Sequence, residues 1–151
     1  MKFLTKDVGR FTLGIWVALA AILLTLLAWI MQSYSLINWE GALELGLQNE
    51  SFNGGPVEQA LADVERGVAL ADIFWALPIT IIALIGVLRK RLFGFVAAMM
   101  DFAICVYFPL VFAFHRWDSH MMTALAAIIL FAIPSLLGIL GLWPNRKLFK
   151  P

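Results

Sequence analysis

Residues 11–31 read FTLGIWVALAAILLTLLAWIM, and this stretch sets the class of the protein. It contains no charged side chain, and a helix of this length, rising about 1.5 Å per residue, crosses the roughly 30 Å hydrocarbon core of a bilayer. The basic residues before it are typical of a signal peptide, but the apolar stretch is too long for one and no A-x-A-like cleavage site follows. We therefore expect an uncleaved first membrane span.

Three more apolar stretches follow, at residues 68–88, 92–114 and 121–143. Of the whole chain, 62% is hydrophobic and 14% is charged, with a mean hydropathy of +0.90. Soluble domains are instead about 45–50% apolar and about 25% charged, and this chain has too few polar groups to cover a water-exposed surface. The composition excludes an ordinary soluble enzyme, a disordered chain and a basic nucleic-acid-binding domain, so no nucleic-acid partner is expected.

Helices are expected for all four spans, because backbone groups inside a bilayer must hydrogen-bond within their own segment. Each stretch is also about twice as long as a membrane β-strand needs to be. The predicted fold is all-α: an integral membrane four-helix bundle that forms a single domain over residues 1–151. Short links at Arg89–Arg91 and His115–His120 predict antiparallel neighbours for the last three spans, and Pro134 predicts a kink in the fourth.

The distribution of basic residues predicts the orientation of the bundle. Cytoplasmic loops are rich in lysine and arginine, and nine of the eleven basic residues lie before the first span, between the second and third, or after the fourth. These nine are Lys2, Lys6, Arg10, Arg89, Lys90, Arg91, Arg146, Lys147 and Lys150. Both termini are therefore expected in the cytoplasm, and the expected location is a bacterial inner (plasma) membrane.

A long first outer loop, residues 32–67, is expected between the first two spans. Acidic residues are concentrated on this outer side, namely Glu40, Glu44, Glu50, Glu58, Asp63, Glu65 and Asp118. Pro56 follows two glycines, as at the first position of a helix, and apolar residues then recur at helical spacing. We expect the second helix to begin near Pro56 and to project about 15–18 Å beyond the membrane. A short helix within residues 39–47 is expected either to pack on the second helix and cover its apolar stripe or to lie at the membrane interface.

Asp101 is the most informative residue, because it lies about 13 Å into the third span. An ionised carboxylate at that depth is costly, so the side chain must face the bundle, find a partner or be protonated. Two interpretations follow. Asp101 relays a proton or cation or anchors a polar ligand, or it is a neutral acid hydrogen-bonded to Thr80, Thr25 or Ser135 that fixes the helix register.

Asp72 lies about one turn inside the second span and is the second candidate for a polar contact in the membrane. One interpretation is an interfacial acid with access to water. The other is an acid that pairs with Arg116 or with a histidine of the neighbouring outer link. Together with Asp101, it is the residue on which a proton, ion or ligand function would depend.

Both histidines of the chain lie in the link between the third and fourth spans. His115, Asp118 and His120 are a candidate outer-face site for a divalent metal, or for sensing external pH, since histidine titrates near pH 6.5. The alternative is a set of solvated interfacial groups. Cys105 is the only cysteine, which excludes an intramolecular disulfide and CxxC chemistry; no further cofactor is expected.

Three functions remain compatible with these patterns. Packing faces dominate while reactive groups are sparse, which favours a non-enzymatic accessory, scaffold or protective membrane protein. It would act through helix packing and its acidic outer loop, within the lipid bilayer, on another membrane protein or as a homo-oligomer. The alternatives are a small ion- or proton-linked transporter or ligand-binding protein that uses Asp101 and Asp72, and an outward-facing metal-dependent or lipid-processing membrane enzyme at His115, Asp118 and His120.

Overall fold

The computed structural model describes residues 2–45 and 55–151. Within these ranges, nothing is described of the side chains of Val57, Glu58, Leu61, Ala62, Glu65, Arg116, Ser119 and His120. The chain comprises two compact units, Met1–Leu26 with Ile79–Pro151 (unit 1) and Leu27–Pro78 (unit 2).

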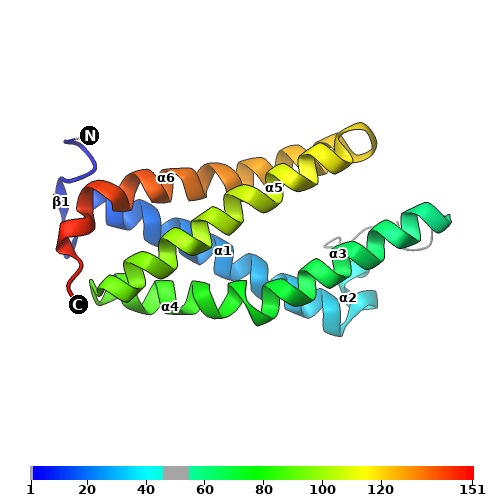
Figure 1. Ribbon diagram of the computed structural model, residues 1–151, viewed down its shortest axis with the longest axis horizontal. Coiled ribbons are helices and arrows are strands. Elements are labelled where there is room, and N and C mark those ends of the chain that lie inside the picture. Colours follow the sequence, from blue (N-terminus) through cyan, green and yellow to red (C-terminus); the bar gives the residue numbers. More distant parts are fainter. Residues whose placement is uncertain (1, 46–54) are drawn as a thin grey trace. The chain divides into compact units, whose positions relative to one another are not determined.

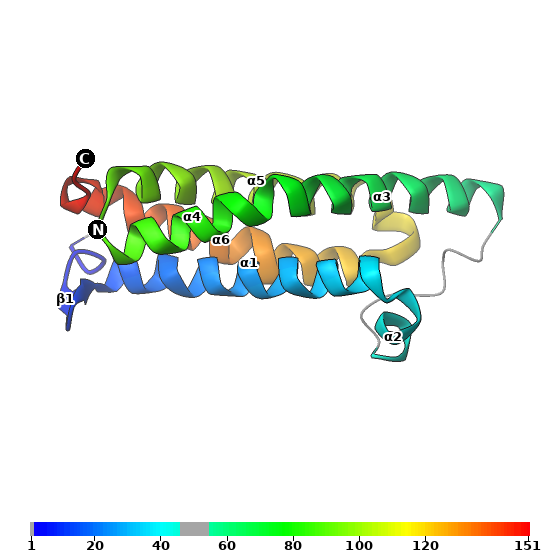
Figure 2. The same ribbon diagram turned by 90° about the horizontal axis from the view of Figure 1, so that it is seen from below.

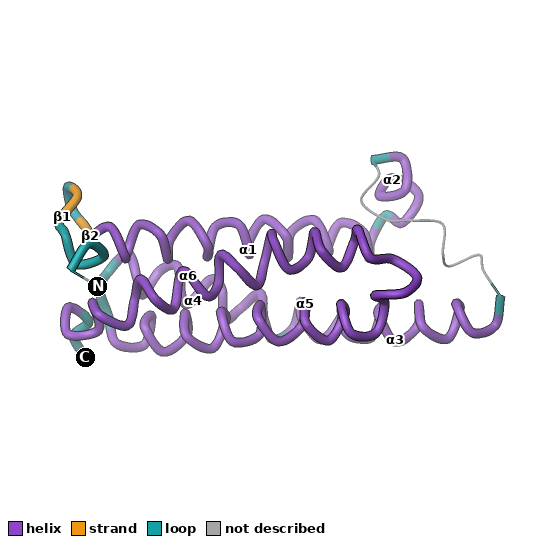
Figure 3. Tube along the Cα trace, turned by 90° about the horizontal axis from the view of Figure 1, so that it is seen from above, coloured by secondary structure: helices purple, strands orange, loops and turns teal. Residues whose placement is uncertain are grey.

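Helices make up most of the described chain (Figures 1 and 3). The α-helices are α1 (Leu13–Ile37), α2 (Trp39–Glu44), α3 (Pro56–Phe74), α4 (Ala76–Leu88), α5 (Leu92–Ala127) and α6 (Ile133–Leu142). A π-helical segment, η2 (Ile128–Ala132), precedes α6, and a 3₁₀ helix, η3 (Trp143–Leu148), follows it. Two short antiparallel strands, β1 (Asp7–Val8) and β2 (Phe11–Thr12), form a hairpin before α1.

In the part of the chain that the structure describes, four helical stretches are long and apolar enough to cross a membrane: Leu13–Ile37, Arg66–Leu88, Leu92–His115 and Met121–Leu148. Large apolar side chains on their outer surfaces, such as Leu23, Ile129 and Leu137, are exposed by half or more. A surface of this kind is unfavourable in water, whereas lipid tails are as apolar as leucine and solvate it. The mostly helical structure with four such helices confirms the all-α prediction and fits an integral membrane protein.

The helix that contains the predicted first span has different ends from that span. Phe11 and Thr12 belong to β2, and the helix begins at Leu13. It then continues to Ile37, and Ser33 and Ser35 within this extension donate their hydroxyls to backbone carbonyls four residues earlier. The segment 32–67, predicted as an outer loop, is therefore helical over much of its length.

The helical stretch that contains the second span begins at Pro56, as predicted, but it consists of two helices rather than one. α3 ends at Phe74, and Trp75 has a backbone that departs from helical geometry (φ −118°, ψ −58°) before α4 begins. Pro78 explains the break, because its ring clashes with the carbonyl four residues earlier, at Phe74, and it has no N–H to bond there.

The link at His115–His120, predicted as a connection between helices, keeps helical hydrogen bonding and belongs to α5. It contains neither glycine nor proline, and helical hydrogen bonding runs through it although the spans on either side, Leu92–His115 and Met121–Leu148, are separate. Figure 2 shows the chain reversing in this yellow part of unit 1. The kink predicted at Pro134 corresponds to η2, a π-helical segment with wider turns. The ring of Pro134 obstructs the carbonyl four residues earlier, at Leu130, and Leu130 lies within η2.

The core of unit 1 is built from apolar side chains of α1, α4, α5 and α6, closed at one end by residues outside the helices. Ile15, Ile22, Val87 and Phe102 are fully buried in it. Phe11 from β2 and Phe149 after η3 join the same cluster. The chain segments before α1 and after η3 therefore pack into the core rather than lying loose beside it.

Glycines permit the closest helix contacts of unit 1. A Cβ added to Gly86 of α4 or Gly94 of α5 would overlap the backbone of the other residue. A Cβ added to Gly14 of α1 or to Gly141 of α6 would likewise overlap the backbone of the other glycine. Because association in a bilayer depends on close packing, these two pairs fix α4 against α5 and α1 against α6.

The turn between α4 and α5 closes through a defined helix-capping pattern. Lys90 has a left-handed backbone (φ +51°), its N–H donates to Val87 O, and the Arg91 N–H donates to Gly86 O. These are the two hydrogen bonds of a Schellman motif, in which glycine usually occupies the position of Lys90. The lysine side chain here makes contacts that glycine could not, since its Nζ donates to Arg10 O at 3.1 Å and lies 5.3 Å from the centre of the Phe11 ring.

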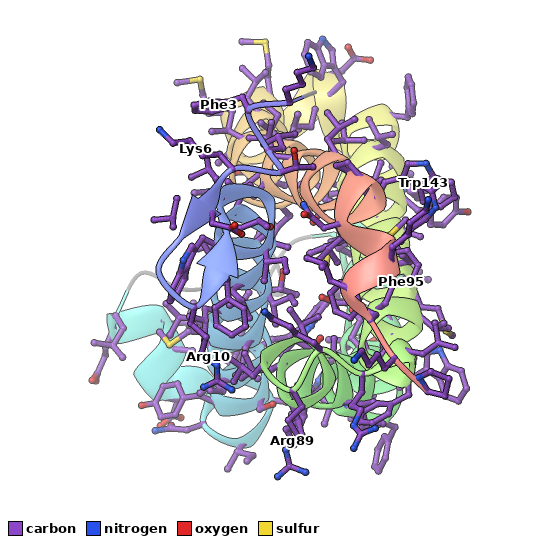
Figure 4. All side chains as sticks on the ribbon, turned by 90° about the vertical axis from the view of Figure 1, so that its left-hand side faces the viewer. Phe3, Lys6, Arg10, Arg89, Phe95 and Trp143 are labelled. Atoms are coloured by element: carbon purple, nitrogen blue, oxygen red, sulfur yellow. The ribbon has the colours of Figure 1, made fainter. Side chains whose placement is uncertain are left out.

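Three basic segments meet at one end of unit 1, which we call the basic end: residues 2–10, 89–91 and 146–150 (Figures 1 and 4). Backbone hydrogen bonds join Leu92 N–H to Lys150 O and Lys150 N–H to Lys90 O. The Asn145 side chain donates to Leu4 O at 3.1 Å and to Gly141 O at 2.7 Å. The nine basic residues that the sequence assigned to one side of the bundle are thus gathered by direct contacts.

Unit 2 contains the end of α1, the short capped helix α2, the whole of α3 and the first residues of α4. The Asn38 side chain accepts a hydrogen bond from the Gly41 N–H at 3.1 Å, which caps α2. This confirms the short helix expected within residues 39–47 for its described part. Gly55 precedes Pro56 at the start of α3, the arrangement expected for proline in a first helical turn.

Candidate functional site

Each of the four helices of unit 1 contributes a polar side chain to its interior. We call this set the polar layer; it comprises Thr25 of α1, Thr80 of α4, Asp101 and Cys105 of α5, and Ser135 of α6. All five are almost completely buried. Sequence reasoning placed Asp101 in the bundle and named the two threonines and Ser135 as its possible partners.

Asp101 binds Thr80 directly. Thr80 Oγ1 donates to Asp101 Oδ1 at 2.5 Å, the short end of the range for a hydroxyl bonded to a carboxyl group. Both residues are fully buried. Along α4 and α5, this bond lies six and seven residues, respectively, beyond the Gly86–Gly94 contact. One polar contact and one glycine contact therefore fix the same helix pair.

The other members of the polar layer bring α1 and α6 to the same depth. Cys105, one turn beyond Asp101, donates its thiol to Thr25 Oγ1 at 3.8 Å, and the Thr25 hydroxyl donates to Ala21 O in its own helix. Gly138 of α6 lies against the Phe102 ring, which places Ser135, one turn earlier on an antiparallel helix, level with Cys105. Ser135 Oγ is buried and makes no hydrogen bond within the described part of the chain.

Asp72 lies in unit 2, near the end of α3. Its carboxylate is half-buried and accepts a hydrogen bond from the side chain of Gln32 on α1. The sequence left two interpretations open, an interfacial acid with access to water and an acid paired with Arg116 or a histidine. The donor that the structure describes is a neutral amide, and the side chains of Arg116 and His120 lie outside the described residues. An acid bonded by an amide at this position resembles the Asp101–Thr80 pair in kind: each carboxyl group is held by a neutral donor from another helix.

The third group of predicted site residues belongs to the helical link of α5. His115 and Asp118 are exposed, and the side chain of His120 is outside the described residues. Among the side chains that the structure describes, no three histidine, cysteine, aspartate or glutamate residues come together as they would around a metal ion. The outer-face metal site remains a prediction from sequence.

A surface groove of about 520 Å³ lies between α4 and α5 near the basic end. Its walls are apolar, formed by Ile79 and Ile82 of α4 and by Leu92, Phe93, Val96 and Met100 of α5, with Pro151 at its end. None of these residues belongs to the polar layer. The groove was not foreseen from the sequence, because hydropathy shows that these side chains are apolar but not that they surround a hollow.

Comparisons with models of protein families, with curated proteins and with solved structures find no match to this chain. What the protein does must therefore follow from its own residues. Those that sequence reasoning singled out inside the membrane, Asp101 and Asp72, are each bonded between helices, and the groove has no titratable lining.

Proposed function

We propose that the protein is a non-enzymatic accessory or scaffold subunit of a bacterial inner membrane, with both ends of the chain in the cytoplasm. The observation that carries the proposal is the buried hydrogen bond between Asp101 and Thr80. This carboxyl group, the strongest candidate for chemistry in the sequence, is fully buried and bonded to Thr80, and the groove described above does not reach it. Asp101 thereby serves as a helix contact, which a scaffold needs and a transport pathway would leave accessible.

The segment 32–67 supplies the second part of the proposal, a surface for a partner protein. It carries six acidic residues and a single arginine. Glu40, Glu44 and Asp63 are exposed on α2 and α3. A concentrated negative charge of this kind steers and selects partners of opposite charge, so we propose that this segment contacts a basic outer surface of another membrane protein or of an exported one.

The orientation can be tested with reporters. A cytoplasm-active reporter fused after Lys150 is expected to be active, and one inserted at Gly55, between α2 and α3, is expected to be inactive. The physical reason is the nine basic residues at the basic end, which membranes retain on the cytoplasmic side. A reporter of opposite requirement, active only outside the cytoplasm, should give the reverse pattern. Outside activity after Lys150 would contradict the proposed orientation.

The function is tested by comparing two neutralised variants. Asp101→Asn keeps an acceptor for the Thr80 hydroxyl, so we expect wild-type expression, melting temperature and partner capture. The triple variant Glu40→Gln, Glu44→Gln and Asp63→Asn should fold normally but lose at least about tenfold in partner affinity, since a rim charge pair contributes a fraction of a kcal/mol to about 1 kcal/mol. Capture by the wild type should also weaken as salt is raised.

The alternative function makes the opposite prediction for the same pair of variants. If Asp101 carries protons or ions, Asp101→Asn will abolish a solute or ion flux in proteoliposomes at normal expression, and the outer triple variant will leave that flux intact. That result would replace the scaffold proposal with the transport one.

A further inference from the structure

The groove between α4 and α5 opens at the basic end. Leu92 and Phe93, which line it, directly follow the Arg89–Arg91 turn. The Arg91 guanidinium donates from Nη1 to Pro151 O at 2.6 Å, and Pro151 is itself a lining residue. The hydrogen bond therefore holds the guanidinium at the mouth of the groove.

From this mouth the groove runs along the membrane-spanning part of α5. The lining residues from Leu92 to Met100 cover about 12 Å of helix. Phe93 and Val96 are about half exposed, and every side chain along the groove is apolar. An open groove of about 520 Å³ with only apolar walls accommodates a hydrocarbon chain.

The charge around the mouth is strongly positive. The basic end carries nine basic residues, and Asp7 is the one acidic residue in the segments 2–10, 89–91 and 146–150. Arg89, Arg91 and Lys150 are exposed there, and Figure 4 shows Arg89 pointing away from the bundle below α4. Arginine binds phosphate groups particularly well, because its planar fork of N–H donors matches two oxygens at once.

We propose that this groove binds an anionic phospholipid, with one acyl chain along α5 and the phosphate against Arg91. The two halves of such a lipid match the two halves of the site: a hydrocarbon chain fits the apolar walls, and a negative headgroup at the membrane surface meets the guanidinium. Basic pockets between spanning helices on the cytoplasmic side bind anionic headgroups by this chemistry. The lipid would also cover the side of the α4–α5 pair, whose contacts hold Thr80 against Asp101.

Binding is tested on the purified full-length protein in a neutral detergent. Phosphatidylglycerol and phosphatidylcholine with identical acyl chains are titrated, and bound lipid is counted by native mass spectrometry while melting temperature is followed. We expect phosphatidylglycerol to bind at least about fivefold more tightly and to raise the melting temperature further, since one basic residue near a membrane surface is worth about that factor. Glycerol 3-phosphate, a headgroup without chains, should bind too weakly to compete.

Matched variants separate the groove from the general charge of the basic end. Arg91→Gln should reduce the preference for phosphatidylglycerol about fivefold and Arg91→Lys should retain most of it, whereas Lys6→Gln, on another side of the same end (Figure 4), should leave it unchanged. Val96→Trp should fill the groove and weaken both lipids, and Val111→Trp, on a similarly exposed part of α5, should not.

Three results would overturn the proposal. Equal binding of the two lipids would remove the role of the headgroup. An equal loss of preference in Arg91→Gln and Lys6→Gln would show diffuse attraction to the whole basic end. A dimer that Val96→Trp converts to a monomer, without a change in lipid binding, would identify the occupant as a second copy of the chain.

Discussion

A Gly94→Val variant is expected to lose more than about 3 kcal/mol of unfolding free energy and to be recovered mostly unfolded or aggregated. Even the Cβ of the new side chain would overlap the backbone of Gly86 on α4. Overpacking in a well-packed core already costs about 1–3 kcal/mol when flexible side chains can move aside, and here the obstacle is main chain. The two helices must separate, which also lengthens the Thr80–Asp101 hydrogen bond.

Unfolding in mixed micelles, followed by circular dichroism or by protease resistance, measures this effect. Gly67→Ala is the matched control, because a Cβ at Gly67 of α3 meets nothing within 4 Å. Alanine is about 1 kcal/mol better than glycine inside a helix, so the control should be as stable as the wild type or slightly more so. Wild-type stability of Gly94→Val would show that α4 and α5 are not in backbone contact.

The second large effect is expected at the polar layer. Thr80→Val replaces a hydroxyl by a methyl group of the same size and removes the donor to Asp101 Oδ1. Loss of a partner from a buried polar group costs about 1–3 kcal/mol, more when that group is charged. We expect a stability loss of about 2 kcal/mol for Thr80→Val, and near-complete recovery in Thr80→Ser, which restores the hydroxyl.

A double-mutant cycle attributes this loss to the pair rather than to packing. Asp101→Leu and Thr80→Val are each measured alone and then together. If the hydrogen bond is the source, the double variant should be about 1–3 kcal/mol more stable than the sum of the single losses predicts, because the second substitution no longer breaks a bond. Strictly additive losses would show that the two residues contribute independently.

The spans and their grouping followed from sequence because bilayer thickness and loop charge act on long segments. Four apolar stretches became four helices long enough to cross a membrane. Asp101 was placed in the interior because an acid at its depth has no favourable alternative, and Thr80 was among its predicted partners. The spans depend on hydropathy and charge summed over many residues, and the burial of Asp101 depends on the large cost of exposing an ionised acid to lipid. Both quantities can be estimated from a single sequence.

Features set by local backbone geometry were missed, although some left a signal. Pro78 broke the second span at Trp75, and its effect on Phe74 was readable from the sequence. Gly9, with φ +65°, forms the hairpin turn between β1 and β2, where a glycine in the first position of a two-residue loop is favoured. The left-handed Lys90 had no such signal, since glycine is the residue expected there and the contacts of Lys90 with Arg10 and Phe11 form only in three dimensions.

Only part of the candidate site could be predicted from the sequence, because the rest depends on contacts that form in three dimensions. The members of the polar layer could be named, but Gln32 as the donor to Asp72 could not, because each is polar at a span boundary and many pairings satisfy that description. The groove depends on the shapes of several side chains at once. A hollow of that kind has no counterpart in composition, periodicity or spacing.

The short turn between α4 and α5 has a consequence for how the chain enters a membrane. Arg89–Arg91 is long enough only for the capping hydrogen bonds at Gly86 and Val87, so α4 and α5 are held as a closed hairpin by local contacts. Thr80 and Asp101 face each other across that hairpin. The two segments can therefore leave the insertion machinery together, with the acid already satisfied by its neighbour, and the carboxyl group need never meet hydrocarbon alone.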